Sequence, residues 1–242
     1  MQAIILAAGR GSRLGDVTAQ RPKGLTPLLH KPLLQWQLDA ITSAGIAETT
    51  VATGYLAEQF APFPVHKIHN SAWQDSNMVR TLLCCDHILQ QQTTLVSYSD
   101  IVYCASSVTA LMNTPGDIVL CYDPDWLNQW QQRFDNPLED AETFDFVNNQ
   151  LLQIGQKAQQ LTKIKGQYMG LFKLTAVGWS VIRDYLYCLD QAALNQLDMT
   201  SLFSLLLAQE VNIQLCPVQG FWFEIDNQKD LALCEKNLAV RK

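Results

Sequence analysis

Residues 6–23 combine small residues, glycines and basic side chains in a pattern suited to binding phosphate. A loop of small residues leaves backbone N–H groups open to phosphate oxygens, because no Cβ blocks their approach. Arg13 can add bidentate, charge-assisted hydrogen bonds, and Lys23 can add a point charge. We therefore predict a triphosphate site in which Arg13 and Lys23 act in catalysis. The loop residues predicted to bind the nucleotide are Leu6, Ala7, Ala8, Gly9 and Gly11.

Two common phosphate-binding motifs do not fit this loop. It lacks the Gly-Lys-Ser or Gly-Lys-Thr ending of a P-loop, and it lacks the third glycine of the dinucleotide-binding fingerprint. Gly9 and Gly11 could simply shape a turn between a strand and a loop, and the loop taken alone leaves that alternative open.

Two aspartates come directly after predicted strands. Asp100 ends the run LVSYSD, and Asp226 ends FWFEID. Open α/β sheets bind ligands beyond the carboxyl ends of their strands. Magnesium prefers oxygen ligands and usually takes one or two carboxylates together with phosphate oxygens. We predict a Mg²⁺ site at Asp100 and Asp226, with Glu224 as a third ligand or a contact to the acceptor; the alternative is that Asp226 merely caps the following helix.

Apolar and β-branched runs alternate with helix-like spacing as far as residue 122. The predicted strands there are 2–7, 49–53, 65–69, 94–99 and 117–122, and the predicted helices are 33–44, 56–60, 77–90 and 108–112. This alternation is typical of a parallel sheet wrapped by helices. Later strands are predicted at 167–174, 211–218 and 221–225, and later helices at 176–189, 201–210 and 226–238.

The pattern weakens between residues 123 and 165, which contain two prolines and many Gln and Asn residues. We interpret this segment as an inserted lid or acceptor-binding region with a hairpin around 147–152. A chain of 242 residues can bury a sizeable core. We therefore predict a single domain over residues 1–242.

The segments LAAGRGSRLG (6–15) and RPKGLTPL (21–28) closely resemble the signature of the sugar-phosphate-type nucleotidyltransferases. The resemblance implies an α/β fold with a Rossmann-like, mixed and mostly parallel sheet. It also implies magnesium-dependent, in-line transfer of a nucleoside monophosphate, with the metal held by the aspartates matching Asp100 and Asp226. A phosphate oxygen of the acceptor would attack the α-phosphorus and pyrophosphate would leave. Catalysis would then consist of positioning and charge stabilisation.

The segment 69–78 lies where the resembling enzymes read the base, and its pattern is more similar to cytidylyltransferases. An Asn side chain offers a donor and an acceptor together, which suits a pyrimidine edge. Asn70 and Asn77 are therefore predicted to bind the nucleotide, which would be CTP. Ser99 is also predicted to bind it. Ser76 as the cap of the next helix is the competing interpretation of this cluster.

A second resemblance involves residues 126–143, 99–103 and 167–172. These segments are similar to bacterial cytidylyltransferases that act on aminoalcohol phosphates and phosphoglutamine. The resemblance implies a role in the decoration of surface polysaccharides. Tryptophans and acidic side chains could form a cage for an ammonium group, whereas the alternative is a solvated acidic loop with two core tryptophans. The predicted acceptor-binding residues are Trp130, Glu139, Asp140, Glu142, Tyr168, Trp222 and Glu224, and Lys157 and Lys173 are further candidates for the acceptor phosphate.

Composition excludes several other classes of protein. With 17 Lys and Arg against 23 Asp and Glu, the formal charge is −6, and there is no long basic run to bind nucleic acid. Neither an export signal nor a membrane-spanning stretch is expected. The seven scattered cysteines favour reduced thiols in a soluble, cytoplasmic protein. The oligomeric state stays open between monomer and homodimer.

Two other functions remain open at this stage. One is a nucleotidyltransferase of the same fold that uses UTP or dTTP and a sugar 1-phosphate. The other is a non-catalytic nucleotide-binding module. The joint presence of Arg13, Lys23, Asp100 and Asp226 argues against the second, because binding alone would not need a two-aspartate metal site.

Overall fold

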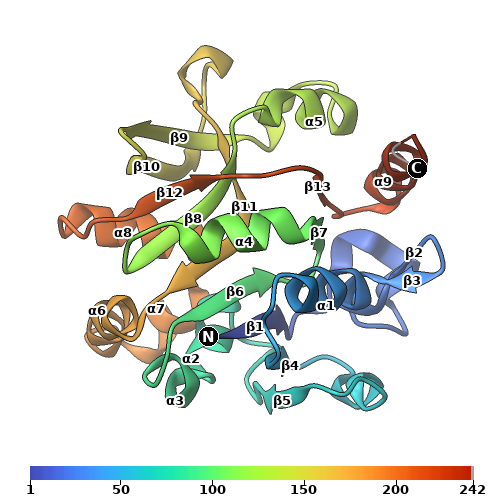
Figure 1. Cartoon of the computed structure of the whole chain (residues 1–242), viewed down its shortest axis with the longest axis horizontal. Helices are drawn as coiled ribbons and strands as arrows, with labels where there is room; N and C mark the ends of the chain where they lie inside the picture. The colour runs from blue at the N-terminus through green and yellow to red at the C-terminus, as the bar shows by residue number, and fades with distance from the viewer. Residues whose placement is uncertain (241–242) are drawn as a thin grey trace.

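A nine-stranded sheet runs through the part of the chain that this computed structural model describes, residues 1–240 (Figure 1). Its order is β5-β4-β1-β6-β11-β8-β12-β10-β9. The bounds are β1 Gln2–Ala7, β4 Thr49–Thr53, β5 His66–His69, β6 Thr94–Tyr98, β8 Ile118–Asp123, β9 Glu142–Val147, β10 Gln150–Lys157, β11 Gln167–Leu174 and β12 Gln214–Pro217. β11 and β10 are antiparallel to their neighbours, whereas β5, β4, β1 and β6 pair in parallel, as do β8 and β12. The predicted mixed, mostly parallel sheet is confirmed.

Helices cover both faces of this sheet. Every residue of β1, β4 and β8 is buried, as expected for strands covered on both sides. α1 and α4 pack against each other in front of the sheet in Figure 1, while α2 packs with α7 and α8 on the far side. The helices are α1 Leu33–Ser43, α2 Met78–Leu83, α3 Asp86–Leu89, α4 Ala105–Asn113, α5 Trp126–Arg133, α6 Ala176–Tyr187, α7 Gln191–Gln196, α8 Met199–Ala208 and α9 Gln228–Ala239. The arrangement is the Rossmann-like α/β fold that was predicted.

The helix predicted over residues 77–90 is instead two helices. α2 ends at Leu83 and α3 begins at Asp86. Trp179 of α6 donates a hydrogen bond of 2.6 Å from Nε1 to Asp86 Oδ1, which ties the first residue of α3 to a neighbouring helix. Periodicity within the segment could not reveal this tertiary contact.

The segment 123–165 is built into the main sheet. β9 and β10 form the predicted hairpin and extend the sheet at one edge. Asn148 and Asn149 make its turn with φ of 51° and 60°, a left-handed conformation that Asn tolerates. The helix α5 was not predicted because most of its residues are polar. Its buried side chains nevertheless recur at helical spacing: Trp126, Gln129, Trp130 and Arg133.

A small two-stranded sheet lies beside the main one. β7 (Ile101–Tyr103) pairs antiparallel with β13 (Trp222–Glu224). α9 packs near them, and the three elements share an apolar cluster separate from the main core, formed by Leu28, Leu33, Val102, Phe223, Ile225 and Cys234. A further two-stranded ribbon joins β2 (Pro27–Leu28) to β3 (Lys31–Pro32).

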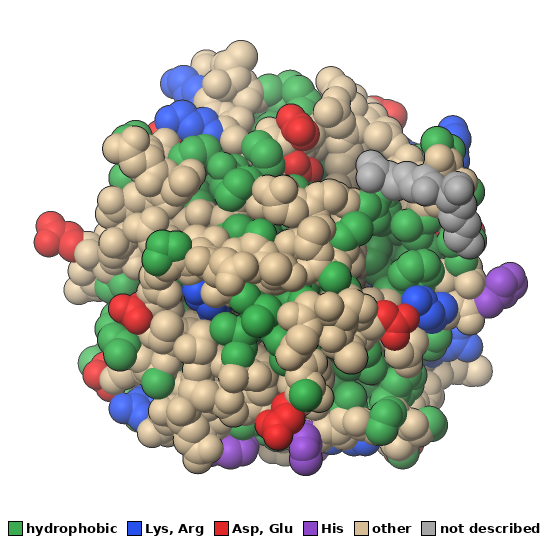
Figure 2. Space-filling view, viewed as in Figure 1, with side chains coloured by type: hydrophobic (Ala, Val, Ile, Leu, Met, Phe, Trp, Pro, Cys, Tyr) green, Lys and Arg blue, Asp and Glu red, His purple; other side chains and the backbone are tan. Residues whose placement is uncertain are grey.

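Charged side chains are scattered in small groups among apolar and uncharged ones on the face seen in Figure 2. No helix within residues 1–240 combines the length and the apolar character needed to cross a membrane. All seven cysteines are free thiols.

Candidate active site

Two adjoining cavities lie where the carboxyl ends of β1 and β6 meet the segment after β13. Arg13, Met78 and Tyr98 line both of them. The first cavity is lined by Leu6, Ala8, Gly9, Gly11, Ser12, Arg13, Lys23, Trp73, Ser76, Asn77, Met78, Thr81, Tyr98, Ser99 and Asp100. The second is lined by Arg13, Met78, Tyr98, Trp130, Asp140, Glu142, Thr143, Phe144, Ile154, Gln167, Tyr168, Gly170, Asp198, Met199, Thr200, Glu224 and Asp226. They are called below the glycine-loop cavity and the acidic cavity.

The glycine loop holds the side chain of Lys23 against its backbone. Gly11 has φ of 69°, and a Cβ at this position would lie 2.7 Å from Lys23 Cβ. Any larger residue would therefore push the lysine aside. Thr18 fixes the loop from within, because its hydroxyl donates to Gly11 O at 2.9 Å. Gly24 packs closely on Ser99, which seats the lysine segment at the end of β6.

Lys23 joins the two predicted aspartates. Its Nζ lies 2.7 Å from Asp100 Oδ2 and 2.7 Å from Asp226 Oδ1. Burial by itself lowers the pKa of the Lys23 ammonium, but the charges of Asp100 and Asp226 outweigh it and raise that pKa. The pairing of β7 with β13 brings the two carboxylates together, since Ile225 N donates to Asp100 O at 2.9 Å.

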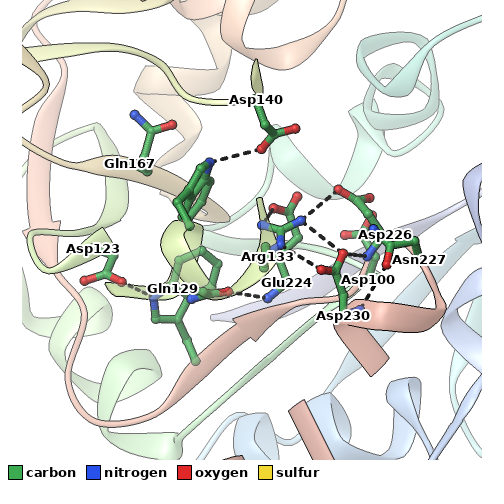
Figure 3. Close-up of polar contacts among 12 residues, drawn as sticks. Asp100, Asp123, Gln129, Arg133, Asp140, Gln167, Glu224, Asp226, Asn227 and Asp230 are labelled. Atoms are coloured by element: carbon green, nitrogen blue, oxygen red, sulfur yellow. Dashed lines mark hydrogen bonds and ion pairs between the residues drawn. The ribbon is translucent and has the colours of Figure 1, made fainter. Parts of the chain in front are cut away.

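A buried arginine holds Asp226 from the other side (Figure 3). The Arg133 side chain is 0% exposed and forms three ion pairs. Its Nη1 lies 2.7 Å from Glu224 Oε2, its Nη2 lies 3.1 Å from Asp226 Oδ2, and its Nε lies 3.1 Å from Asp230 Oδ1. A planar guanidinium can orient several carboxylates at once, which a lysine cannot do. The sequence analysis did not include Arg133 or Asp230 among the site residues; the helical spacing of the buried α5 residues was the available signal.

Asp226 does not cap α9. The cap is Asn227, whose Oδ1 accepts a hydrogen bond of 3.0 Å from Asp230 N. The carboxylate of Asp226 is therefore free to face three basic side chains, with Arg13 Nη1 at 3.3 Å as the third. Burial raises the pKa of Asp226, but Lys23, Arg13 and Arg133 together lower it below its usual range. The helix-cap alternative for Asp226 was wrong.

The acidic cavity carries more negative than positive charge. Its lining includes five carboxylates and one arginine, Arg13: the acids are Asp140, Glu142, Asp198, Glu224 and Asp226. Aromatic side chains form part of its wall, and Tyr98 meets Tyr168 edge to face with centroids 5.8 Å apart. Such a surface suits a cationic group.

Two of these acids are held by specific neighbours. Trp130 donates from Nε1 to Asp140 Oδ2 at 3.1 Å, which explains why this tryptophan is both buried and at the cavity wall. Gln167 clamps the backbone of Glu142, donating to its O at 2.6 Å and accepting from its N at 3.1 Å. Burial and the nearby charge of Asp198 raise the pKa of Glu142 to about 7.

Several predicted base-binding residues lie elsewhere or have other contacts. Asn70 is buried, and its amide is occupied: Nδ2 donates to Ser76 Oγ and Thr81 Oγ1, and Oδ1 accepts from Ala72 N. Asn70 therefore shapes the loop and does not line the glycine-loop cavity. Asn77, not Ser76, caps α2, and both line the cavity. Ala7 is buried at the end of β1 and is not among the lining residues.

Four predicted acceptor contacts lie outside the acidic cavity. Glu139 and Lys157 are exposed and do not line it. Trp222 is buried and donates from Nε1 to Asp123 Oδ2 at 2.8 Å; its ring centroid lies 6.3 Å from that of Trp130, but it does not line the acidic cavity. Lys173 is also buried, where it donates to the carbonyl oxygen of Thr114. The predicted cage of two tryptophans is therefore wrong at this cavity, because Trp130 lines it and Trp222 lies behind it, bonded to Asp123 of β8.

The oxygen atoms at Asp100 and Asp226 fit a magnesium ion. Both carboxylates are hard donors where the two cavities adjoin: Asp100 lines the glycine-loop cavity and Asp226 lines the acidic cavity. Asp100 Oδ1 is buried without a hydrogen-bond partner among the described residues. Within residues 1–240 no group of three or more His, Cys, Asp or Glu residues is arranged to hold a metal by itself. The remaining ligands would then have to come from phosphate oxygens and water.

Comparisons with known proteins point to the same chemistry. Residues 3–144 match the model of the MobA-like NTP transferase domain. The chain is 34% identical to the CTP:phosphoglutamine cytidylyltransferase of Campylobacter jejuni subsp. jejuni, over 96% of this chain and 98% of that protein. A choline-phosphate cytidylyltransferase of Streptococcus pneumoniae is 38% identical over 32% of this chain and 35% of its own.

Solved structures give the same fold. The structure of CTP:phosphocholine cytidylyltransferase from Streptococcus pneumoniae matches with a TM-score of 0.72, covering 98% of each chain at 20% identity. The predicted resemblance is thus confirmed by a family match over more than half of the chain and by a relative matched over almost its whole length. This chain belongs to the MobA-like NTP transferase domain family and is a nucleotidyltransferase.

Proposed function

We propose that the chain transfers CMP from CTP to a small phosphorylated amine and releases pyrophosphate, with Mg²⁺ as cofactor. The observation that carries this proposal is the pair of adjoining cavities that meet at Arg13 and at the Lys23–Asp226 ion pair. One cavity offers glycines and basic side chains to a triphosphate. The other offers carboxylates to a cationic acceptor.

The chain's own residues would act by position and charge. A magnesium ion held by Asp100 and Asp226 would supply positive charge to neutralise the phosphates. Arg13, whose side chain is 70% exposed, and Lys23 would stabilise charge on the phosphoryl group during transfer. No general base is needed, because the attacking phosphate oxygen is already anionic. Arg133 would keep Asp226 and Glu224 at the junction of the two cavities.

The choice of CTP is supported by the two relatives, both of which are cytidylyltransferases. Asn77 and Ser99 line the glycine-loop cavity and are the predicted polar residues placed to contact the nucleotide. Asn70 would act indirectly, by fixing the loop around Ser76.

The choice of a phosphorylated amine is supported by the charge of the acidic cavity. A sugar 1-phosphate carries no positive charge, so it would gain little from Asp140, Glu142 and Asp198. The relative from Campylobacter jejuni acts on phosphoglutamine and the one from Streptococcus pneumoniae on choline phosphate. We extend the proposal to a cytoplasmic enzyme that supplies surface-polysaccharide decoration, which the resemblance and the free cysteines support.

Mass spectrometry of reaction products tests this function. Purified protein is given Mg²⁺ and CTP with phosphoglutamine, phosphocholine, phosphoethanolamine or 2-aminoethylphosphonate, and in parallel UTP or dTTP with glucose 1-phosphate. With at least one acceptor we expect stoichiometric pyrophosphate and a cytidylylated product, which is a CDP-linked compound from a phosphate acceptor and a CMP-phosphonate from 2-aminoethylphosphonate. A sugar nucleotide as the main product would favour the alternative substrates. Absence of pyrophosphate from every mixture would favour a non-catalytic module.

A further inference from the structure

The ammonium of Lys23 lies between the two carboxylates that are proposed to hold the metal. Both N–O distances are 2.7 Å, and the Lys23 and Asp226 side chains are only 8% and 6% exposed. Magnesium binds carboxylate oxygens at about 2.0–2.1 Å, so an ion joining these two oxygens would occupy the space of Nζ. Two cations cannot share that space, because their charges repel and their atoms collide.

We propose that Lys23 occupies the cation position of the free enzyme, and that a divalent ion takes this position only when the triphosphate draws the ammonium away. The proposal rests on the metal assignment made under the proposed function. It predicts that the free protein binds a divalent ion weakly. Metal and nucleotide would then bind together, so the ion would enter already bound to phosphate.

Lys23 is the partner free to move. Its stem is a flexible chain of four carbons that lies on Gly11, directly beside the predicted phosphate-binding loop. Asp226 is fixed, since Arg133 holds its Oδ2 at 3.1 Å and its backbone N–H donates to Asp230 Oδ2 at 3.0 Å. A short rotation of the lysine stem would transfer its charge from the carboxylates to a phosphate.

The two carboxylates differ in what they lose when the ammonium leaves. Asp226 still contacts Arg133 and Arg13. Asp100 makes its ion pair with Lys23, and its Oδ1 is already buried without a partner. The Asp100 side chain is 20% exposed, and a largely buried carboxylate left without a counter-charge is costly. Asp100 therefore gains most from a replacement cation.

Binding of Mn²⁺ alone, measured by electron paramagnetic resonance without nucleotide or acceptor, tests the exchange. Lys23→Met keeps the length of the side chain but removes its charge, and we expect it to bind one Mn²⁺ at least about tenfold more tightly than the wild type. Lys31→Met is the matched control, because Lys31 pairs with the exposed Asp39 away from the site. It should bind Mn²⁺ as the wild type does.

Adding Asp100→Asn to Lys23→Met should abolish the gain in Mn²⁺ affinity. Equal affinities of wild type and Lys23→Met, or a gain that survives Asp100→Asn, would overturn the proposal. If Lys23→Met does not fold, thermal unfolding of the wild type decides. Mn²⁺ should raise its midpoint appreciably only when pyrophosphate is also present. Strong stabilisation by Mn²⁺ alone that Asp100→Asn removes would refute the exchange. No turnover enters these measurements, so their outcome is separate from that of the product analysis.

Discussion

The two adjoining cavities are assembled in different ways. Most of the glycine-loop cavity comes from two stretches, the loop after β1 with Lys23 and the segment 73–81, together with the end of β6. The acids of the acidic cavity come from positions spread between residues 140 and 226. The proposed phosphate site depends on local backbone conformation and nearby basic residues, whereas the proposed acceptor site depends on how distant elements pack. The first can therefore be recognised in a sequence more readily than the second.

The cavities also differ in how firmly their charges are held. Lys23 belongs to the glycine-loop side and has a flexible stem. Arg133 belongs to the acidic side, is fully buried and is fixed by three carboxylates. Asp226 accepts hydrogen bonds from both Lys23 and Arg133, so it links the charged groups of the two cavities.

The largest effect is expected from removing the charge at the junction. Asp226→Asn would remove the carboxylate that Lys23 and Arg133 share, and with it a proposed metal ligand. We expect kcat/KM to fall about a thousandfold or more, as when a charge-stabilising group is lost from an active site. The rate of pyrophosphate release gives kcat/KM for the variant and the wild type. Asp39→Asn, at an exposed ion pair, is the control and should keep normal activity.

Arg133→Met tests whether the acidic side needs its buried arginine. The change would leave Glu224, Asp226 and Asp230 close together without their shared counter-charge. We expect about a hundredfold loss in kcat and about 3–5 kcal/mol loss in the free energy of unfolding, because one partner of a buried ion pair is removed.

Arg133→Lys separates positioning from simple charge. A lysine restores the charge but not the planar contacts, so it should recover stability more than kcat. Full recovery of kcat by lysine would show that charge alone suffices. Denaturant unfolding and steady-state kinetics give the two readouts, with Arg183→Met, on an ion pair of 3.7 Å outside the site, as the control.

A smaller effect is expected from Glu142→Gln, which should distinguish the two cavities by substrate. Loss of this carboxylate should raise KM for a cationic acceptor about tenfold, a modest electrostatic contribution, and leave KM for CTP unchanged. Glu139→Gln is a closely matched control three residues away, since Glu139 is exposed and does not line the cavity. Equal effects on both substrates would contradict the assignment of the acidic cavity to the acceptor.

The smallest effect concerns pH. The pKa of Glu142 is raised to about 7 by burial and by Asp198, so the group is neutral below that pH and charged above it. KM for phosphocholine, whose quaternary amine does not titrate, should fall as pH rises through about 7. The acceptor phosphate titrates equally for every variant. The predicted quantity is therefore the difference in the pH dependence of KM between the wild type and Glu142→Gln. Identical pH profiles of KM would contradict the prediction.

The sequence by itself determined the α/β sheet, the glycine loop and the two strand-end aspartates, because strand periodicity and glycine content act over a few residues. Gly11 and Lys23 were recognised for the same reason. The structure shows that they are in close contact, because a Cβ at position 11 would collide with the Lys23 side chain.

Only the tertiary structure decided which polar side chains reach the cavities. The amide of Asn70 is hydrogen-bonded to nearby side chains, and the indole of Trp222 is hydrogen-bonded to Asp123. Arg133 pairs with Asp226, which lies 93 positions later in the chain. The direction of a side chain depends on the packing of the element that carries it and on partners supplied by distant segments. Local spacing encodes neither of these. The contacts of Arg133 exist because α5 packs beside α9, an arrangement that only the tertiary structure shows.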